Sequence, residues 1–166
     1  MRSNWQILSV ALGLVLGLAF GVAALTSAEE SEVKASEKVP MKLDPEKLAG
    51  KGLESIPPWP VEALIEGESK HWGEVLFRGD IIVEVYEAVP SILKIVAPYD
   101  EFIYILEGEL IITDLEGRAF RYEAGDHVVM PKGFEGTWQT LGRYRELIVV
   151  ERQSWEASAS ADGKSE

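Results

Sequence analysis

Two short stretches of this sequence decide its fold: YDEFIYILEGE at residues 99–109 and GDHVVMPKG at residues 125–133. The pattern in and around them has a period near two and is broken at short intervals by glycine, proline and acidic turns. A period of two is typical of strands that bury one face, and frequent turns keep those strands short. The sequence therefore predicts an all-β sandwich or barrel.

The same pattern continues on both sides of these stretches. Two junctions are predicted to be tight turns, Glu107–Glu109 and Asp114–Gly117, because glycine permits the positive φ that such turns need. The aliphatic runs 81–83 and 111–112 indicate strands covered on both faces, so we expect two barrels to pair through a sheet as a homodimer. The predicted strands are residues 61–65, 74–78, 81–88, 92–97, 101–106, 110–114, 119–123, 127–130, 136–141 and 145–151.

The N-terminus has the composition of an export segment. Arg2 precedes an apolar run at residues 7–25, and the small residues Thr26–Ala28 follow it. This order predicts a signal peptide at residues 1–28. The run is also close to the ~20 residues that span a bilayer, so an uncleaved anchor is the alternative. Either way we expect the domain to be exported, periplasmic or secreted, with membrane contact only through an uncleaved segment.

The rest of the chain divides by composition into a single domain and its extensions. Polar, small residues predict a flexible tether at 29–55 and a disordered tail at 157–166. Closely spaced prolines predict an extended arm at 56–70, which we expect Trp59 to pin onto the barrel. The barrel itself is predicted at 71–156.

Composition excludes several classes of function. The formal net charge is −12, and such a chain repels a nucleic-acid backbone, so we expect no nucleic-acid partner. There is no cysteine, which excludes disulfides, thiolate nucleophiles and sulfur-ligated metals. The only histidines are His71 and His127, so one chain cannot build a three-histidine metal site.

The two opening stretches resemble the two motifs of the cupin superfamily. The spacing from Gly125 to Pro131, the Pro-x-Gly at 131–133 and the segment FEGTW at 134–138 are most similar to small cupins of the (S)-ureidoglycine aminohydrolase type. The resemblance covers about half of the chain. It implies a single double-stranded β-helix, the jelly-roll barrel, with a site in the barrel mouth.

The resemblance also implies that the usual cupin metal site is missing. Glu101 stands at the position of the family's glutamate ligand. The three histidine positions fall on residues without a metal-binding side chain, namely Gly136 together with either Ile95 and Ala97 or Lys94 and Val96. We therefore expect no metal and no cofactor. A site built from His71, His127 and Glu101 is an alternative that needs both histidines to converge.

Five residues are the candidates for binding a ligand: Glu101, Lys94, Tyr99, Asp100 and Trp138. Strand alternation places Glu101 among apolar side chains, where it must be paired, hydrogen-bonded or protonated. Lys94 is our candidate partner; the alternative is that it points to solvent. Tyr99 and Asp100 lie at the expected barrel mouth or form a solvated turn. Trp138 forms a wall of the cavity or belongs to the core.

Three functions remain open from the sequence. The first is an exported cupin that binds a small molecule in its barrel mouth without a metal. The second is a hydrolase or lyase of the ureidoglycine aminohydrolase type that acts on a small nitrogen compound, with Glu101 as acid or base. The third is a structural or assembly role.

Overall fold

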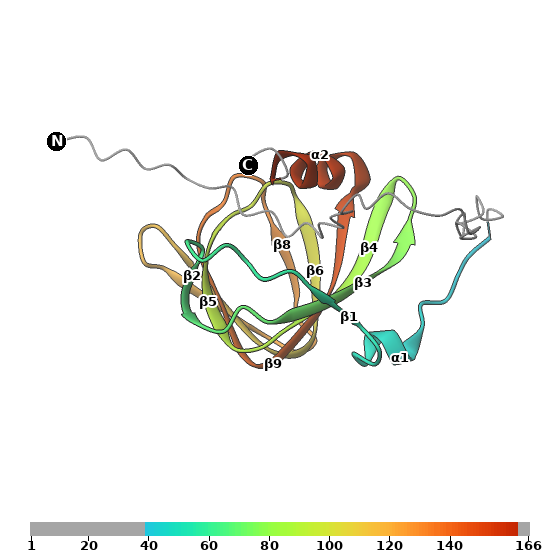
Figure 1. Ribbon diagram of the computed structural model, residues 1–166, viewed down its shortest axis with the longest axis horizontal. Helices are drawn as coiled ribbons and strands as arrows, with labels where there is room; N and C mark the ends of the chain where they lie inside the picture. Colours follow the sequence, from blue (N-terminus) through green and yellow to red (C-terminus); the bar gives the residue numbers. More distant parts are fainter. Residues whose placement is uncertain (1–38, 163–166) are drawn as a thin grey trace, which may run out of the picture.

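The computed structural model of the protein describes residues 39–162, and side chains as far as residue 158. Nine strands form one curled sheet, with a short helix before it and a longer one after it (Figure 1). The all-β prediction is confirmed. The elements are α1 Pro45–Leu48, β1 Glu54–Ile56, β2 Leu64–Gly67, β3 His71–Arg78, β4 Ile81–Ala88, β5 Ser91–Val96, β6 Glu101–Asp114, β7 Ala119–Glu123, β8 His127–Met130, β9 Glu135–Glu151 and α2 Arg152–Asp162.

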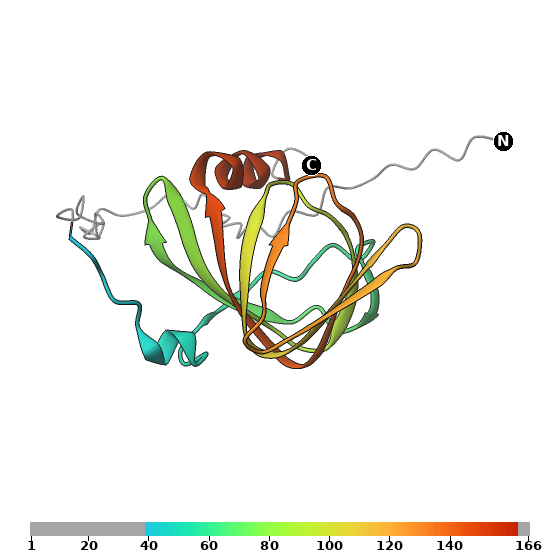
Figure 2. The same cartoon turned by 180° about the vertical axis from the view of Figure 1, so that it is seen from behind.

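Strand β9 organises the sheet. One path of neighbouring strands runs β1-β3-β4-β9-β5-β2, and β6 pairs with β7, β8 and β9 away from this path. The first part of β9 pairs with β5 and its last part with β4, while β6 follows β9 along both parts. All of these pairs are antiparallel. The result is a curled barrel, seen from opposite sides in Figures 1 and 2.

The structure corrects one predicted turn and confirms the other. Residues 107–109 do not form a turn, because β6 continues through them with a shift of register. Gly108 has φ +80°, and a Cβ atom there would lie 2.6 Å from the carbonyl oxygen of Arg143. Glycine is needed at this bulge for close approach of two strands. At the second turn, the N–H of Gly117 donates to the carbonyl oxygen of Asp114 at 3.0 Å, as predicted.

Both predicted flexible ends contain regular structure. The predicted tether includes α1, whose N-terminus is capped by the Asp44 side chain, and β1, which pairs with β3. The predicted tail begins inside α2. The reason lies in tertiary packing that composition does not reveal, since Trp155 of α2 is buried against Ile82, Tyr99 and Val150. The predicted signal peptide or anchor at residues 1–28 lies outside the described residues.

The core lies inside the curled sheet, and the arm closes one side of it. Trp59 packs against this core, stacks on His71 at 5.1 Å between ring centroids, and donates from its indole to the Tyr86 hydroxyl at 3.3 Å. The predicted pinning of the arm by Trp59 is therefore seen. Within residues 39–162, no helix has the length and apolar character needed to cross a membrane.

Candidate functional site

Glu101 opens β6 and points into the barrel. It lies opposite Val150 of β9 and Met130 of β8, and only 7% of it is exposed. The residues that alternate with it, Ile103 and Ile105, are fully buried in the core, as strand alternation predicts. One carboxyl oxygen of Glu101, Oε1, is buried and has no hydrogen-bond partner within the described part of the chain.

Two further carboxyl groups, which the sequence analysis missed, share this interior. Glu84 of β4 is 3% exposed and Glu146 of β9 is fully buried. Glu84 lies opposite Ile148, and Glu146 lies opposite Tyr86, so both project from the same face as the core residues around them. The barrel interior therefore collects carboxyl groups from three strands.

A glycine makes room for one of these groups. A Cβ atom at Gly73 of β3 would lie 2.7 Å from Oε1 of Glu84 and equally close to Cδ1 of Ile56. Any larger residue at this position would displace the carboxyl group or the side chain from β1. The lack of a side chain at Gly73 thus leaves the space that the Glu84 carboxyl group occupies.

Burial raises the pKa of all three carboxyl groups. It raises the pKa of Glu84 to about 7, although the positive charge of Arg78 acts in the opposite direction. Burial, with the nearby Glu84 charge, raises the pKa of Glu101 to about 8. The pKa of Glu146 is raised well above its ordinary value by burial and by the Glu101 charge. Each ionised carboxylate therefore disfavours the ionisation of its neighbours, as expected for like charges in a poorly solvated interior.

Tyrosine hydroxyls border the carboxyl groups. The Tyr144 hydroxyl donates to Oε2 of Glu146, while Oε1 of Glu146 is buried without a partner in residues 39–162. Burial raises the pKa of Tyr144 and of Tyr86, with added contributions from the buried glutamates. Both phenols consequently stay neutral and act as hydrogen-bond donors or acceptors rather than as bases.

The cupin histidine positions cannot supply a metal ligand. Lys94 is exposed, so the inward-facing positions are those of Ile95 in β5, which packs against the core, and of Ala97 just after β5, which is buried. At the third position, Gly136, a Cβ atom would lie 2.1 Å from the carbonyl oxygen of Thr113. The part of the chain that is described contains no group of three or more His, Cys, Asp or Glu residues arranged to hold a metal. The residues present do not fit the usual cupin metal.

The predicted ion pair between Lys94 and Glu101 is wrong. The Lys94 side chain points to solvent, and its backbone N–H donates to the carbonyl oxygen of Ala63 at 2.8 Å. Its neighbours in the strand alternate so that Leu93, not Lys94, faces the core. The raised pKa of Glu101 indicates that a proton, rather than a lysine, neutralises this buried group.

Tyr99 and Asp100 have different surroundings from one another. Tyr99 is buried with Ile82, Val150 and Trp155 at the end of the barrel where β6 begins, so it is not part of a solvated turn. Asp100 is exposed, and its side chain accepts a hydrogen bond from the N–H of Lys132 at 2.8 Å. Asp100 therefore joins two loops and points away from the buried carboxyl groups.

Trp138 is a core residue that is connected to the carboxyl groups through Tyr144. It packs edge-to-face on Tyr144, with 6.2 Å between the ring centroids, and Tyr144 in turn binds Glu146. Trp138 therefore fixes the orientation of the phenol that orients Glu146.

The histidines do not converge on Glu101, so the alternative site with two histidines is wrong. His71 is buried, with Nε2 2.6 Å from the carbonyl oxygen of Pro57, and burial lowers its pKa. His127 is exposed at the start of β8 and stacks on Tyr104 at 4.7 Å. Because Tyr104 is offset from Glu101 by an odd number of strand positions, this stack lies on the opposite face of β6.

The C-terminal helix covers the end of the barrel that holds Glu101. Figure 1 shows α2 lying across the ends of β4, β6 and β9. Its Trp155 is buried there, and the Arg78 guanidinium lies 4.9 Å from the centre of the indole. Arg78 also forms a 3.4 Å ion pair with Glu156 of α2. The helix thus covers the approach to Glu101.

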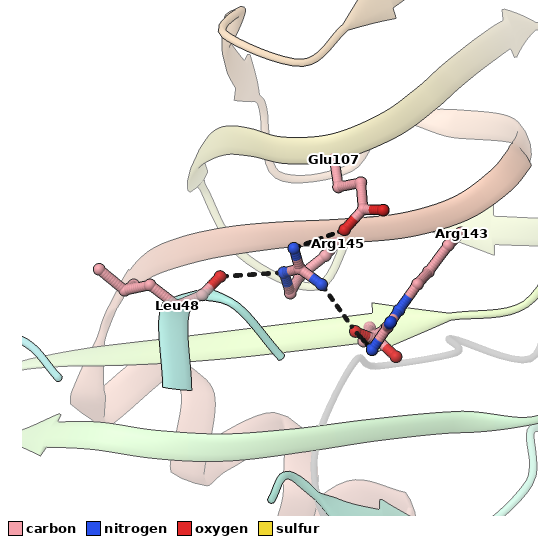
Figure 3. Close-up of polar contacts among 5 residues, drawn as sticks. Leu48, Glu107, Arg143 and Arg145 are labelled. Atoms are coloured by element: carbon pink, nitrogen blue, oxygen red, sulfur yellow. Dashed lines mark hydrogen bonds and ion pairs between the residues drawn. The ribbon is translucent and has the colours of Figure 1, made fainter. Parts of the chain in front are cut away.

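A second charged cluster lies on the outer face and is structural. Arg145 donates to Glu87 at 3.0 Å, to Glu107 at 2.5 Å and to the carbonyl oxygen of Leu48 at 2.9 Å, and Arg143 also pairs with Glu87 (Figure 3). The Arg145 side chain is almost completely buried. This network joins the end of α1 to the barrel, and its charged groups pair with one another.

Comparison with known proteins agrees with this architecture. Residues 79–145 match the family model described as the EutQ-like cupin domain. No curated protein matches the chain. Similar solved structures include a putative ethanolamine utilization protein Q from Salmonella typhimurium, at 24% identity and a TM-score of 0.45, and the EutQ protein of Clostridium difficile, at 21% and 0.47. A protein of unknown function from Pseudomonas syringae has 19% identity and a TM-score of 0.55.

These matches cover only parts of the proteins compared. They cover 49%, 53% and 59% of this chain, and 69%, 66% and 43% of the Salmonella, Clostridium and Pseudomonas chains respectively. At such identities the likeness of the Pseudomonas protein supports the fold alone. The chemistry of the site must be argued from the residues of this chain.

Proposed function

We propose that the barrel, whose residues 79–145 match the EutQ-like cupin family model, binds a small molecule in its interior, at Glu84, Glu101 and Glu146, without the usual cupin metal. The observation that carries this proposal is a pair of buried carboxyl oxygens, Oε1 of Glu101 and Oε1 of Glu146, which have no hydrogen-bond partner among residues 39–162. A buried polar atom without a partner costs about 1–3 kcal/mol, and a ligand that satisfies these atoms recovers that free energy.

A thermal-shift screen of small metabolites tests this proposal. A ligand that binds only the folded state raises the unfolding temperature in proportion to its affinity. We expect at least one compound to stabilise the wild type and to lose this effect in Glu101→Gln. Glu123→Gln, which changes an exposed carboxylate on β7, should keep the full effect. Metal analysis that finds a stoichiometric ion bound through Glu101 would count against a metal-free site.

A second candidate function is acid–base catalysis, favoured by the pKa values of about 7 for Glu84 and about 8 for Glu101. A carboxyl group that titrates near neutral pH can both accept and donate a proton, as general catalysis requires. This would make the protein a hydrolase or lyase for a small nitrogen compound, as in cupins of the ureidoglycine aminohydrolase type. Conversion of a bound compound by the wild type, with binding but no conversion in Glu101→Gln, would support it.

Two further proposals concern where the domain works. We propose that residues 1–28 direct export to the periplasm or the exterior, or anchor the domain, as their order of charged, apolar and small residues supports. We also propose a homodimer, supported by the exposure of Phe102 at 40% and of Val129 at 68%, which lie opposite one another on β6 and β8. Light scattering of the wild type and Phe102→Asp tests the pairing; a monomeric wild type would refute it.

A further inference from the structure

The strap, residues 57–63 between β1 and β2, closes one side of the barrel through few contacts. Within it Ala63 is buried and Trp59 is half-buried, while the other residues are exposed. Strand β1 pairs with β3 and β2 pairs with β5, so the strap crosses the barrel from one end of the sheet path to the other (Figure 1). It is therefore held at its two ends and by the contacts of Trp59 and Ala63.

His71, the first residue of β3, joins the strap to the barrel wall. Its Nε2 lies 2.6 Å from the carbonyl oxygen of Pro57, and because a carbonyl oxygen only accepts, this nitrogen donates. The Trp59 ring stacks on the imidazole, and the Tyr86 ring of β4 packs against it edge-on, with 5.6 Å between the centroids. The backbone N–H of Trp59 donates to Oγ of Ser69 at 2.6 Å. The imidazole is thus enclosed between the strap and β4, and only 3% of His71 is exposed.

The second ring nitrogen of His71 is poorly placed to take up a proton in this closed arrangement. Nδ1 is buried and has no hydrogen-bond partner among residues 39–162. A proton there would create a buried charge and a buried donor without an acceptor, and both cost free energy. Burial accordingly lowers the pKa of His71, although the hydrogen bond to Pro57 acts in the opposite direction. The closed strap therefore favours a neutral His71.

The groups that face His71 do not offset a positive charge on it in mildly acidic solution. Tyr86 contacts the ring, and its phenol stays neutral because burial raises its pKa. Three buried carboxyl groups whose charges act on that phenol also have raised pKa values, so they become protonated as the pH falls: Glu84, Glu101 and Glu146. The strap residues in contact with the ring carry no charge. Lys70, the preceding residue, pairs with Glu68 at the exposed surface.

We propose that the strap is an acid-sensitive closure of the barrel, in which protonation of His71 releases Trp59 and the rest of residues 57–63 from β4. In the released state the imidazole meets water and takes up a proton as an ordinary histidine does. The closed state disfavours that proton, so the preference for closure is fully present above about pH 6.5 and falls about tenfold for each pH unit below it. This device is separate from the proposed ligand site and does not depend on it.

Hydrogen exchange of the full chain, followed amide by amide by nuclear magnetic resonance, tests the proposal. The reporting amides are those of Trp59, Ala63 and Lys94, which donate to Ser69, Pro60 and Ala63 respectively. After correction for the intrinsic pH dependence of exchange, we expect their protection to fall about tenfold between about pH 7.5 and about pH 5.5. The amides of β6 and β9 should not follow, because protonation of the buried glutamates stabilises the barrel over the same range.

Two histidine variants assign the effect. His71→Gln keeps a side-chain N–H donor but does not ionise, so its strap amides should be equally protected at both pH values. His127→Gln is the matched control, because His127 is exposed on β8, and it should keep the tenfold change. If His71→Gln does not fold, the His71 ring resonances of the wild type decide, since a closed strap requires their midpoint to lie below about pH 6.5. Strap protection that is independent of pH, a pH effect that persists in His71→Gln, or a His71 midpoint at or above about pH 6.5 would each overturn the proposal.

Discussion

Replacing Glu84 by glutamine should make the protein more stable at alkaline pH than the wild type. Burial raises the pKa of Glu84 from 4.5 to about 7, so the folded state holds its proton more tightly than the unfolded state does. The stability linked to this proton is fully present below about pH 4.5 and is lost as the pH rises to about 7. At ~1.4 kcal/mol for each pH unit, the full loss is about 3.5 kcal/mol in the wild type, and Glu84→Gln removes it.

Urea denaturation at about pH 5 and about pH 8 measures this difference, because the free energy of unfolding extrapolates linearly to water. We expect the advantage of Glu84→Gln over the wild type to grow by about 3 kcal/mol between the two pH values. Glu123→Gln is the control, since its carboxylate is exposed on β7, and it should keep the pH dependence of the wild type. If Glu84→Gln also keeps that pH dependence, the buried carboxyl does not titrate as described and the reasoning fails.

Four other substitutions probe the surroundings of the site. Gly136→Ala should cost more than ~1 kcal/mol in urea denaturation, because its Cβ would meet the Thr113 carbonyl oxygen at 2.1 Å; an unchanged midpoint would contradict this. Trp155→Ala should cost ~3 kcal/mol or more by the same assay through loss of the packing under α2, and a negligible cost would show that the helix is not held there. Arg145→Met should cost ~3 kcal/mol because it removes the almost buried guanidinium that pairs with both Glu87 and Glu107, with the half-exposed Arg143→Met as the milder control. Lys94→Met should change neither the free energy of unfolding nor its pH dependence, because Lys94 is exposed. A changed pH dependence would show that Lys94 does pair with Glu101.

The sequence predicted the barrel well because its strands carry a period of two between strong turn signals. The strands at 81–88, 119–123 and 127–130 agree residue for residue with β4, β7 and β8. The predicted turn at 107–109 failed because a glycine with positive φ serves a bulge as well as a turn, and only the partner strand distinguishes them. The helix α2 was missed because a single buried tryptophan, Trp155, holds it.

Of the buried carboxyl groups, only Glu101 was predicted from the sequence, because it stands at the position of the glutamate in the first cupin motif. Glu84 stands between two valines and Glu146 between Arg145 and Leu147, so the neighbouring residues did not show which face of those strands is the interior. Their signal was present in the alternation of Glu84 with the core residues Ile82 and Tyr86. Lys94 was misassigned because the motif left two possible registers for β5, and only the structure shows that the register with Ile95 and Ala97 inward is the correct one.

The central claim is that Glu101 is neutralised by a proton inside the barrel. Nuclear magnetic resonance titration of protein labelled with ¹³C at the glutamate side-chain carboxyls measures this directly, with Glu84→Gln, Glu101→Gln and Glu146→Gln assigning the resonances. We expect the Glu101 resonance to titrate near pH 8, far above the ordinary value of 4.5, and the Glu84 resonance near pH 7. A Glu101 resonance that titrates near pH 4.5 would contradict the account, because the carboxylate would then be ionised and stabilised by a partner that the structure does not show.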